Sequence, residues 1–200
     1  MDLEQWLDHI QRWCAKHPRW MILIDGRCGS GKTTIAQRMV QPLNAYCIHM
    51  DDYYLPFEKR DHQPDFPGNH MDYQRLQKQV IEPFIQNGKF DSIPYDAHQD
   101  HYGQITLVKT NGLIIEGSYS MFPHLVYPHD TLKLFITIDP NVQKQRIIAR
   151  GGMACWSGFE QRWIPTEESY FKMYSIQEKA DMVLSFDGTT ISIHSMKTLS

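Results

Sequence analysis

The feature that most constrains this fold is a glycine-rich turn near the start of the chain. The apolar residues 22–24 before it are typical of a buried strand, and residues 33–40 after it have the pattern of a helix. Residues 26–33 have the spacing GxxxxGK[ST] of a phosphate-binding P-loop in its required strand, loop and helix context. Glycines let the turn point successive amides inward, and the helix N-terminus adds partial positive charge. The sequence therefore predicts a site for phosphate groups.

Two side chains of this loop indicate what the phosphate groups belong to. Lys32 is expected to reach the β and γ phosphates of a nucleotide as a point charge. The Thr33 hydroxyl is expected to complete the shell of a magnesium ion that keeps most of its waters. A flexible Gly/Ser turn can match the pattern by chance, but the flanking strand and helix argue against that. The residues expected to bind ATP are Gly26, Arg27, Cys28, Gly29, Ser30, Gly31, Lys32, Thr33 and Thr34.

Composition limits the classes of protein to consider. Two hundred residues with average hydrophobic content fit one compact domain with a substantial core. A net charge of −3 leaves no broad cationic surface, which argues against a nucleic-acid partner. The four cysteines lack CxxC or Cys/His spacing, so neither a zinc site nor a disulfide framework is indicated. Without a leader-like start or a membrane-length apolar run, we expect a cytoplasmic protein without a membrane partner, and the sequence leaves a homo-oligomer open.

Strand and helix patterns alternate along the chain, which predicts an α/β fold of three layers with a mostly parallel sheet of about five strands. The expected strands are residues 20–25, 46–50, 113–117, 132–138, 182–184 and 191–193. The expected helices are residues 3–14 capped by Asp2, 33–40, 73–87 capped by Asp72, 142–150, and 166–174 with a cap at Thr166. Residues 53–70 are expected to form a long irregular loop, and residues 90–95 and 104–109 a hairpin-like flap.

The residues on the acceptor side of the site decide whether a P-loop protein hydrolyses its nucleotide, acts as a switch or transfers a phosphoryl group to an acceptor. Direct transfer to a hydroxyl needs a nearby carboxylate that orients and deprotonates it. Asp51 and Asp52 follow the second expected strand, at the edge where open α/β sheets bind ligands, although either acid can instead cap a helix or turn. Glu116 ends an apolar strand and is expected to contact magnesium through water, the alternative being a buried partner for an arginine.

Basic side chains of a later helix are expected to complete the site. Gln143, Arg146 and Arg150 fall on one helical face, and Arg150 precedes a glycine pair at 151–152 that is expected to act as a hinge. Such cations, with Arg162 beyond them, can close over the transferring phosphate, whereas a solvated basic face is the competing interpretation. Segments expected to border the same cleft carry Asp72, Tyr95, Asp96, His98 and His101.

The order of these motifs resembles the uridine kinase-like family of P-loop kinases, which is similar to phosphoribulokinase and bacterial pantothenate kinase. The matching segments are residues 24–34, 50–54, 95–96, 115–117, 143–150 and 180–181. The resemblance implies transfer of a γ-phosphoryl group from ATP, with magnesium, to a hydroxyl of a small-molecule acceptor. It places the base on Asp51, the lid arginines on Arg146 and Arg150, a ribose-contacting acid on Asp72 and a substrate-pocket tyrosine on Tyr95.

The resemblance also implies a single P-loop kinase domain over residues 1–200. We expect an N-terminal helix at 1–19, a P-loop core at 20–50, an acceptor-binding loop, helix and flap at 51–112, further core at 113–150, a lid at 151–165, and a C-terminal helix and strands at 166–200.

The acceptor is the least defined part of this interpretation. The resemblance implies a nucleoside of the uridine or cytidine type, or a related metabolite. Uridine kinases carry a His-Pro-Asp segment where this chain has residues 67–72, so the resemblance supports a small hydroxyl compound more strongly than uridine itself. The alternatives are a kinase for pantothenate or another non-nucleoside alcohol, a nucleotide-binding module without activity, and a GTPase-type switch. Residues 65–68 match DxxG, but they lie in the irregular loop and no NKxD follows. The residues expected to contact the acceptor are Asp52, Tyr54, Asp72, Tyr95 and His98.

Overall fold

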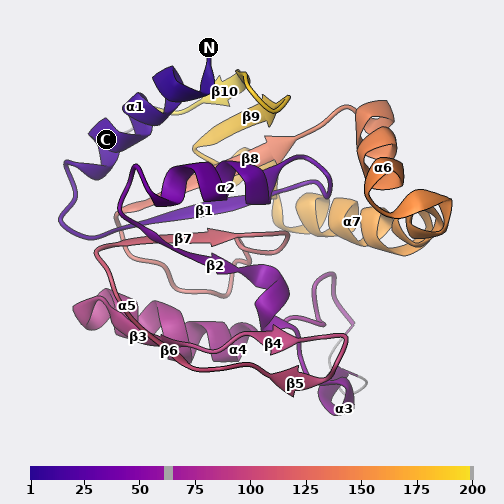
Figure 1. Ribbon diagram of the computed structural model, residues 1–200, viewed down its shortest axis with the longest axis horizontal. Helices are drawn as coiled ribbons and strands as arrows, with labels where there is room; N and C mark the ends of the chain where they lie inside the picture. The colour runs from indigo at the N-terminus through magenta and orange to yellow at the C-terminus, as the bar shows by residue number, and fades with distance from the viewer. Residues whose placement is uncertain (61–64, 199–200) are drawn as a thin grey trace.

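The computed structural model of the chain describes residues 1–60 and 65–198, in which helices flank an open sheet (Figure 1). The six strands of this sheet are ordered β10-β9-β8-β1-β7-β2, and all pair in parallel except β10, which is antiparallel to β9. They are β1 (Trp20–Gly26), β2 (Tyr46–His49), β7 (Gly112–Glu116), β8 (Thr131–Thr137), β9 (Met182–Phe186) and β10 (Ile191–Met196). The predicted three-layer α/β fold with a mostly parallel sheet is confirmed.

The two faces of the sheet bury separate halves of the core. Ile22 and Ile24 of β1 pack beneath α1 (Leu3–Cys14) and α2 (Lys32–Val40), whereas Met21 and Leu23 face the opposite cluster. Side chains alternate across a strand, so a strand covered on both faces is apolar at successive positions. The predicted first helix is confirmed, with Asp2 accepting a hydrogen bond from the Gln5 amide (2.8 Å).

The segment between β2 and β7 forms a helix and a flap beside the sheet. The helix comprises α4 (Tyr73–Leu76), a π turn η2 (Gln77–Ile81) and α5 (Glu82–Asn87). Pro83 has no amide hydrogen to donate to the preceding turn, which accounts for the wider turn before it. The flap pairs β3 (Lys89–Ser92) with β6 (Thr106–Lys109) and β4 (Tyr95–Asp96) with β5 (His101–Tyr102), as the hairpin prediction requires.

Two sequence predictions need correction. The expected irregular loop at 53–70 begins at the last residue of η1 (Met50–Tyr53) and contains a short helix, α3 (Phe57–Arg60), while its residues 61–64 lie outside the described residues. The expected helix start at Thr166 is wrong, because one helical path runs through α6 (Pro140–Gly158), η3 (Phe159–Trp163) and α7 (Ile164–Tyr174), followed by α8 (Ile176–Lys179). Thr166 lies inside this path, where its hydroxyl donates to the Arg162 carbonyl (2.8 Å) instead of capping a helix.

The lid is therefore helical, with one break. Gly152 has φ 75° and ψ −177°, so the backbone leaves the helix at the expected glycine pair. None of the helices in the described part of the chain has both the length and the apolar character needed to cross a bilayer.

A buried carboxylate fixes two segments, the loop after β7 and helix α7, to the strand that enters the P-loop. Asp25 has no exposed surface and ends the apolar part of β1. It accepts hydrogen bonds from the amides of Gly26 (2.7 Å), Tyr119 (3.2 Å) and Met121 (3.0 Å) and from the Tyr170 hydroxyl (2.9 Å). Burial raises the pKa of Asp25 to about 6, and these donors limit the rise.

We expect Asp25→Asn to lower the free energy of unfolding by about 1–3 kcal/mol, because an amide nitrogen cannot accept from the buried donors around it. Urea unfolding near neutral pH measures this change. Asp91→Asn is the control, since Asp91 is exposed on β3 and its replacement should change the value by less than about 0.5 kcal/mol. An unchanged midpoint for Asp25→Asn would contradict the stabilising role of these contacts.

Candidate active site

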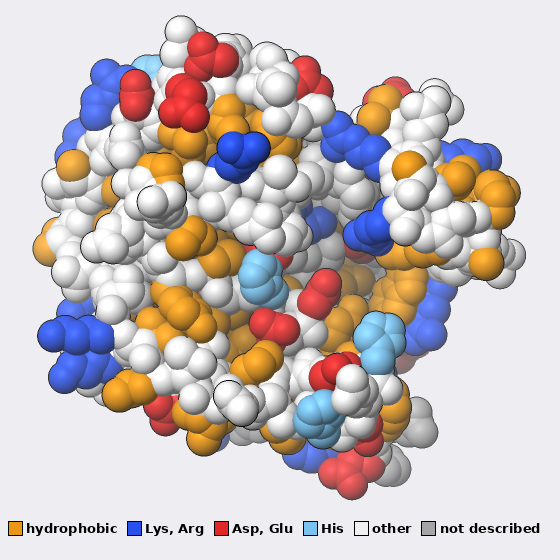
Figure 2. Space-filling view, viewed as in Figure 1, with side chains coloured by type: hydrophobic (Ala, Val, Ile, Leu, Met, Phe, Trp, Pro, Cys, Tyr) orange, Lys and Arg blue, Asp and Glu red, His pale blue; other side chains and the backbone are white. Residues whose placement is uncertain are grey.

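A cavity of about 590 Å³ opens where the P-loop meets the loops after β2 and β7. Its walls come from Lys32 of the P-loop, Asp51 of η1, Glu116 of β7 and Arg150 of α6, with the turn at 186–188 at another side. Figure 2 shows the surface hollowed between the body of the molecule and the lid, with basic and acidic side chains around the opening. Parallel strands end at this edge of the sheet, which is where α/β folds place ligands.

The P-loop is pressed against the neighbouring strand. A Cβ on Gly26 would lie 2.1 Å from the Ile136 carbonyl oxygen, and the φ of Gly26 is 131°, so this position requires glycine. The following amide, of Arg27, donates to that same carbonyl (3.1 Å). The turn that reaches the N-terminus of α2 is thereby held in one geometry.

Lys32 lies across this turn. Its ammonium donates to the carbonyls of Gly26 (2.6 Å) and Arg27 (3.0 Å), and its side chain lines the cavity. An ammonium has three donors, so one remains for a phosphate oxygen. Lys32 is thus positioned at the entrance of the helix, where negative charge is most stabilised.

Oxygen atoms suited to a magnesium ion meet beside Lys32. The Thr33 hydroxyl donates to Glu116 Oε1 (3.1 Å), and both residues line the cavity. Hydroxyl and carboxylate oxygens are the ligands that Mg²⁺ prefers, so Thr33 and Glu116 fit the metal role predicted for them.

His49 also contacts Glu116, a contact that the sequence analysis missed. Its Nδ1 donates to Glu116 Oε1 (2.5 Å), and the two residues are partners in the parallel register of β2 and β7. The hydrogen bond to Glu116 raises the pKa of His49, although burial opposes the rise. Strand register is the only signal that pairs these two residues, and it cannot be read from either segment alone.

The two candidate bases occupy different cavities. Asp51 lines the main cavity, whereas Asp52 lines a second cavity of about 550 Å³ beside β2. Burial, and next the charge of Glu116, raise the pKa of Asp51, with Lys32 partly offsetting them. Asp51 therefore lies within electrostatic range of the P-loop lysine and of the expected metal ligand.

The predicted lid arginines differ in their contacts. The Arg146 guanidinium donates to the carbonyls of Gly29 (3.2 Å) and Phe186 (3.1 Å), so Arg146 braces the P-loop against the end of β9. Arg150 lines the cavity and lies over the Phe159 ring, 5.5 Å from its centroid. Both arginines line the cavity, but the guanidinium of Arg146 is bound by backbone carbonyls. Arg150 is therefore the arginine placed to contact a negatively charged group in the cavity.

The predicted acceptor residues are divided by the structure. Tyr54 lines the main cavity. Asp72 instead caps α4 by accepting from the Arg75 amide (3.0 Å), and Tyr95 donates its hydroxyl to Asp100 within the flap. His98 is exposed at the flap turn. Asp72, Tyr95 and His98 are not among the residues that line the cavity, and their contact with an acceptor stays a prediction.

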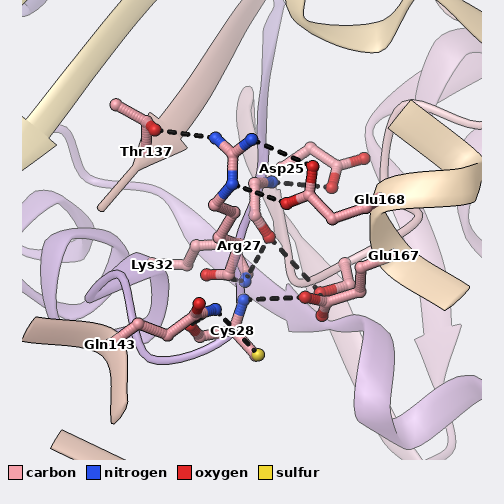
Figure 3. A network of polar contacts seen from close by, with 10 residues as sticks. Asp25, Arg27, Cys28, Lys32, Thr137, Gln143, Glu167 and Glu168 are labelled. Atoms are coloured by element: carbon pink, nitrogen blue, oxygen red, sulfur yellow. Dashed lines mark hydrogen bonds and ion pairs between the residues drawn. The ribbon is translucent and has the colours of Figure 1, made fainter. Parts of the chain in front are cut away.

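Two adjacent glutamates of α7 contact the P-loop (Figure 3). Glu167 accepts from the Cys28 amide (2.9 Å), and Glu168 receives two hydrogen bonds from the Arg27 guanidinium (2.6 and 3.0 Å). Of these glutamates, Glu167 also lines the cavity. In the sequence, these two acids follow Thr166 and are typical of the first turn of a helix, which gives no indication of their contacts with the P-loop.

Comparisons with known proteins agree with this fold. No family model matches the sequence. The uridine kinase of Borrelia duttonii is 24% identical over 182 residues, which cover 84% of this chain and 87% of that protein. A structure from Bacillus stearothermophilus, described as a possible uridine kinase, has a TM-score of 0.65 at 21% identity and covers 90% of this chain and 98% of its own. A structure from Silicibacter sp. TM1040, assigned provisionally as a fructose transport system kinase, has a TM-score of 0.65 at 14% identity, over 82% of this chain and 92% of its own.

We expect His49 to titrate above the ordinary histidine pKa of about 6.5 in magnesium-free buffer, because Glu116 stabilises its charged form. Glu116→Gln should lower that pKa, as NMR titration of the ring would measure. The stability from this pair is full below the unfolded-state pKa and is lost as pH rises through the folded-state pKa. A wild-type pKa at or below the ordinary value would contradict the pairing.

Proposed function

We propose that this chain, a uridine kinase-like P-loop kinase by its relatives and its fold, transfers the γ-phosphoryl group of ATP to a hydroxyl of a small molecule. The observation that carries the proposal is that Asp51 and Lys32 line one cavity. A phosphate cradle on one side and a carboxylate on the other are what direct transfer to an alcohol requires. A nucleotide-binding module without activity does not need the carboxylate.

The nucleotide would lie along the P-loop. Its phosphates would meet the N-terminus of α2 and the Lys32 ammonium, and its nucleoside end would extend toward Arg146 and the turn at 186–188. An added Cβ at Gly188 meets no atom within 4 Å, so that end of the cavity is open. Thr33 and Glu116 would hold the magnesium ion, which neutralises charge on the β- and γ-phosphate oxygens.

Asp51 would orient the acceptor hydroxyl and take its proton. As the acceptor oxygen bonds to the γ-phosphorus, the bond from that phosphorus to the bridging oxygen breaks, ADP leaves with the electron pair, and the proton passes to Asp51 and then to solvent. Burial raises the pKa of Asp51, which makes its carboxylate a stronger base.

The lid would complete the site above the transferring group. Arg150 supplies positive charge where the phosphoryl oxygens gain negative charge. Phe159 and Trp163 line the same cavity and would exclude water, which otherwise competes with the acceptor.

The acceptor proposed first is a nucleoside of the uridine or cytidine type, or a related metabolite. The Borrelia uridine kinase supports it, since its match spans most of both chains. The second candidate is a non-nucleoside alcohol, such as pantothenate or a sugar. The Silicibacter structure supports the sugar, because the same fold carries a provisional assignment to fructose transport there.

A coupled assay for ADP tests the proposal. The protein is incubated with Mg-ATP and a panel of nucleosides, sugars, sugar alcohols and pantothenate, and product phosphorylation is checked by mass spectrometry. We expect ADP formation that depends on one class of acceptor. ADP formation that is independent of every acceptor, or absent across the panel, would contradict a small-molecule kinase.

We expect Asp51→Asn to lower turnover by about 100- to 10,000-fold, because the amide cannot accept the hydroxyl proton. Mg-ATP affinity should stay within about twofold, since the P-loop is unchanged. Asp52→Asn is the comparison, because that carboxylate lines the other cavity, and its turnover should fall by less than about tenfold. A larger loss for Asp52→Asn than for Asp51→Asn would move the base to Asp52.

A further inference from the structure

Glu167 is a buried carboxylate that the proposed phosphoryl transfer does not use. Only 5% of the residue is exposed, and it lines the cavity with Lys32 and Asp51. Its Oε2 accepts from the Cys28 amide (2.9 Å) and its Oε1 from the Ser118 hydroxyl (2.5 Å). An ionised carboxylate has about four acceptor positions, so about half of this capacity remains for a further donor.

Glu167 lies on the side of the cavity where the acceptor would bind. Its charge adds to burial in raising the pKa of the hydroxyls of Tyr54 and Tyr119, so both rings are near it. Tyr54, Tyr119 and Trp163 line the cavity and each packs against His70, at ring-centroid distances of 5.2, 5.1 and 5.5 Å. We call these three aromatic residues the acceptor wall.

The acceptor wall contains a polar atom without a partner. Tyr119 is only 3% exposed, and among the described residues its hydroxyl has no hydrogen-bond partner. A buried hydroxyl without a partner costs free energy, so this atom is a candidate to bind a ligand. Tyr119 directly follows Ser118 in the chain, and the Ser118 hydroxyl already donates a hydrogen bond to Glu167.

We infer that Glu167, with the hydroxyls of Ser118 and Tyr119, forms a second recognition group for the acceptor, and that the acceptor is an uncharged or cationic polyol. The inference rests on the proposed kinase function. Such a molecule offers one hydroxyl to Asp51 and a second to Glu167, while the C–H face of its ring packs on the acceptor wall.

The charges around the cavity favour a polyol over an alcohol that carries a carboxylate. Four carboxylates line it, those of Asp51, Glu116, Glu167 and Asp187. An anionic group placed between Asp51 and Glu167, on the acceptor side, would be repelled. The cations that line it, Lys32, Arg146 and Arg150, belong to the P-loop and to α6. Two further arginines, which are not among the lining residues, lie over rings of the acceptor wall: Arg60 is 5.5 Å from the Tyr54 centroid and Arg162 is 4.7 Å from the Trp163 centroid.

A structural role for Glu167 is the competing account, and two variants separate the roles. Glu167→Gln keeps the shape of the side chain, so its amide can still accept from Cys28 and donate to Ser118, while the charge is lost. Tyr119→Phe removes a hydroxyl that forms no hydrogen bond with a described residue, so a purely structural role predicts no loss. Glu178→Gln is the matched control, because Glu178 is exposed on α8 and is not among the residues that line the cavity.

The experiment measures kinetics with uridine as the polyol probe and pantothenate as the carboxylate-bearing probe. We expect wild type to prefer uridine, and Glu167→Gln to raise the KM for uridine about tenfold while the KM for Mg-ATP stays within about twofold. Tyr119→Phe should raise the uridine KM several-fold, and Glu178→Gln should leave it unchanged. Glu167→Gln should also increase the relative kcat/KM for pantothenate.

Equilibrium binding keeps the inference testable without turnover. Calorimetry with uridine, in the presence of a non-hydrolysable Mg-ATP analogue, should show weaker binding to Glu167→Gln and Tyr119→Phe than to wild type. If uridine binds more weakly to both variants but no turnover is observed, the kinase proposal is contradicted and the recognition group is supported. A preference for pantothenate, no uridine binding to wild type, or equal KM values in wild type, Glu167→Gln and Tyr119→Phe would overturn the inference.

Discussion

The close passage of Gly26 against β8 is the constraint on which the site depends. No side chain fits between this residue and the Ile136 carbonyl, so the chain can turn there only as glycine with a left-handed backbone. The turn directs α2 back over the sheet with its N-terminus facing the strand ends. Because β7 and β2 follow β1 in parallel register, the same edge receives Glu116 and, just after β2, Asp51. The proposed phosphate cradle, metal ligand and base therefore all follow from one arrangement of strands.

Helix α7 ties the lid to this arrangement. Tyr170 bonds to Asp25, Glu168 to Arg27 and Glu167 to Cys28, so three contacts of one helix hold the first turn of the P-loop (Figure 3). At the other end of the lid, Arg146 bonds to the P-loop carbonyls. The break at Gly152 lies between these two attachments, so the lid segment that covers the cavity is joined to the core at both ends.

Local patterns predicted the parts of the site that depend on a single segment. The P-loop, Glu116 at a strand end and the acid after β2 each carry their signal in a few residues, and the resemblance to uridine kinase-like P-loop kinases is confirmed by the relatives and the fold. Glu167, Ser118 and His49 were missed because their partners are set by strand register and by how α7 packs, which are long-range properties. Thr166 and Glu167 have the composition of a helix start, but the helix continues into them from η3, and the Thr166 hydroxyl bonds to the Arg162 carbonyl one turn earlier.

A crystal structure of the Asp51→Asn variant with Mg-ATP and the acceptor found by the panel tests the central claim most directly. The account predicts that the acceptor hydroxyl lies about 3–3.5 Å from the γ-phosphorus, opposite the bridging oxygen, and hydrogen-bonds to the side chain at position 51. A γ-phosphate held at Lys32 with position 51 out of reach of any hydroxyl in line with it would contradict the account.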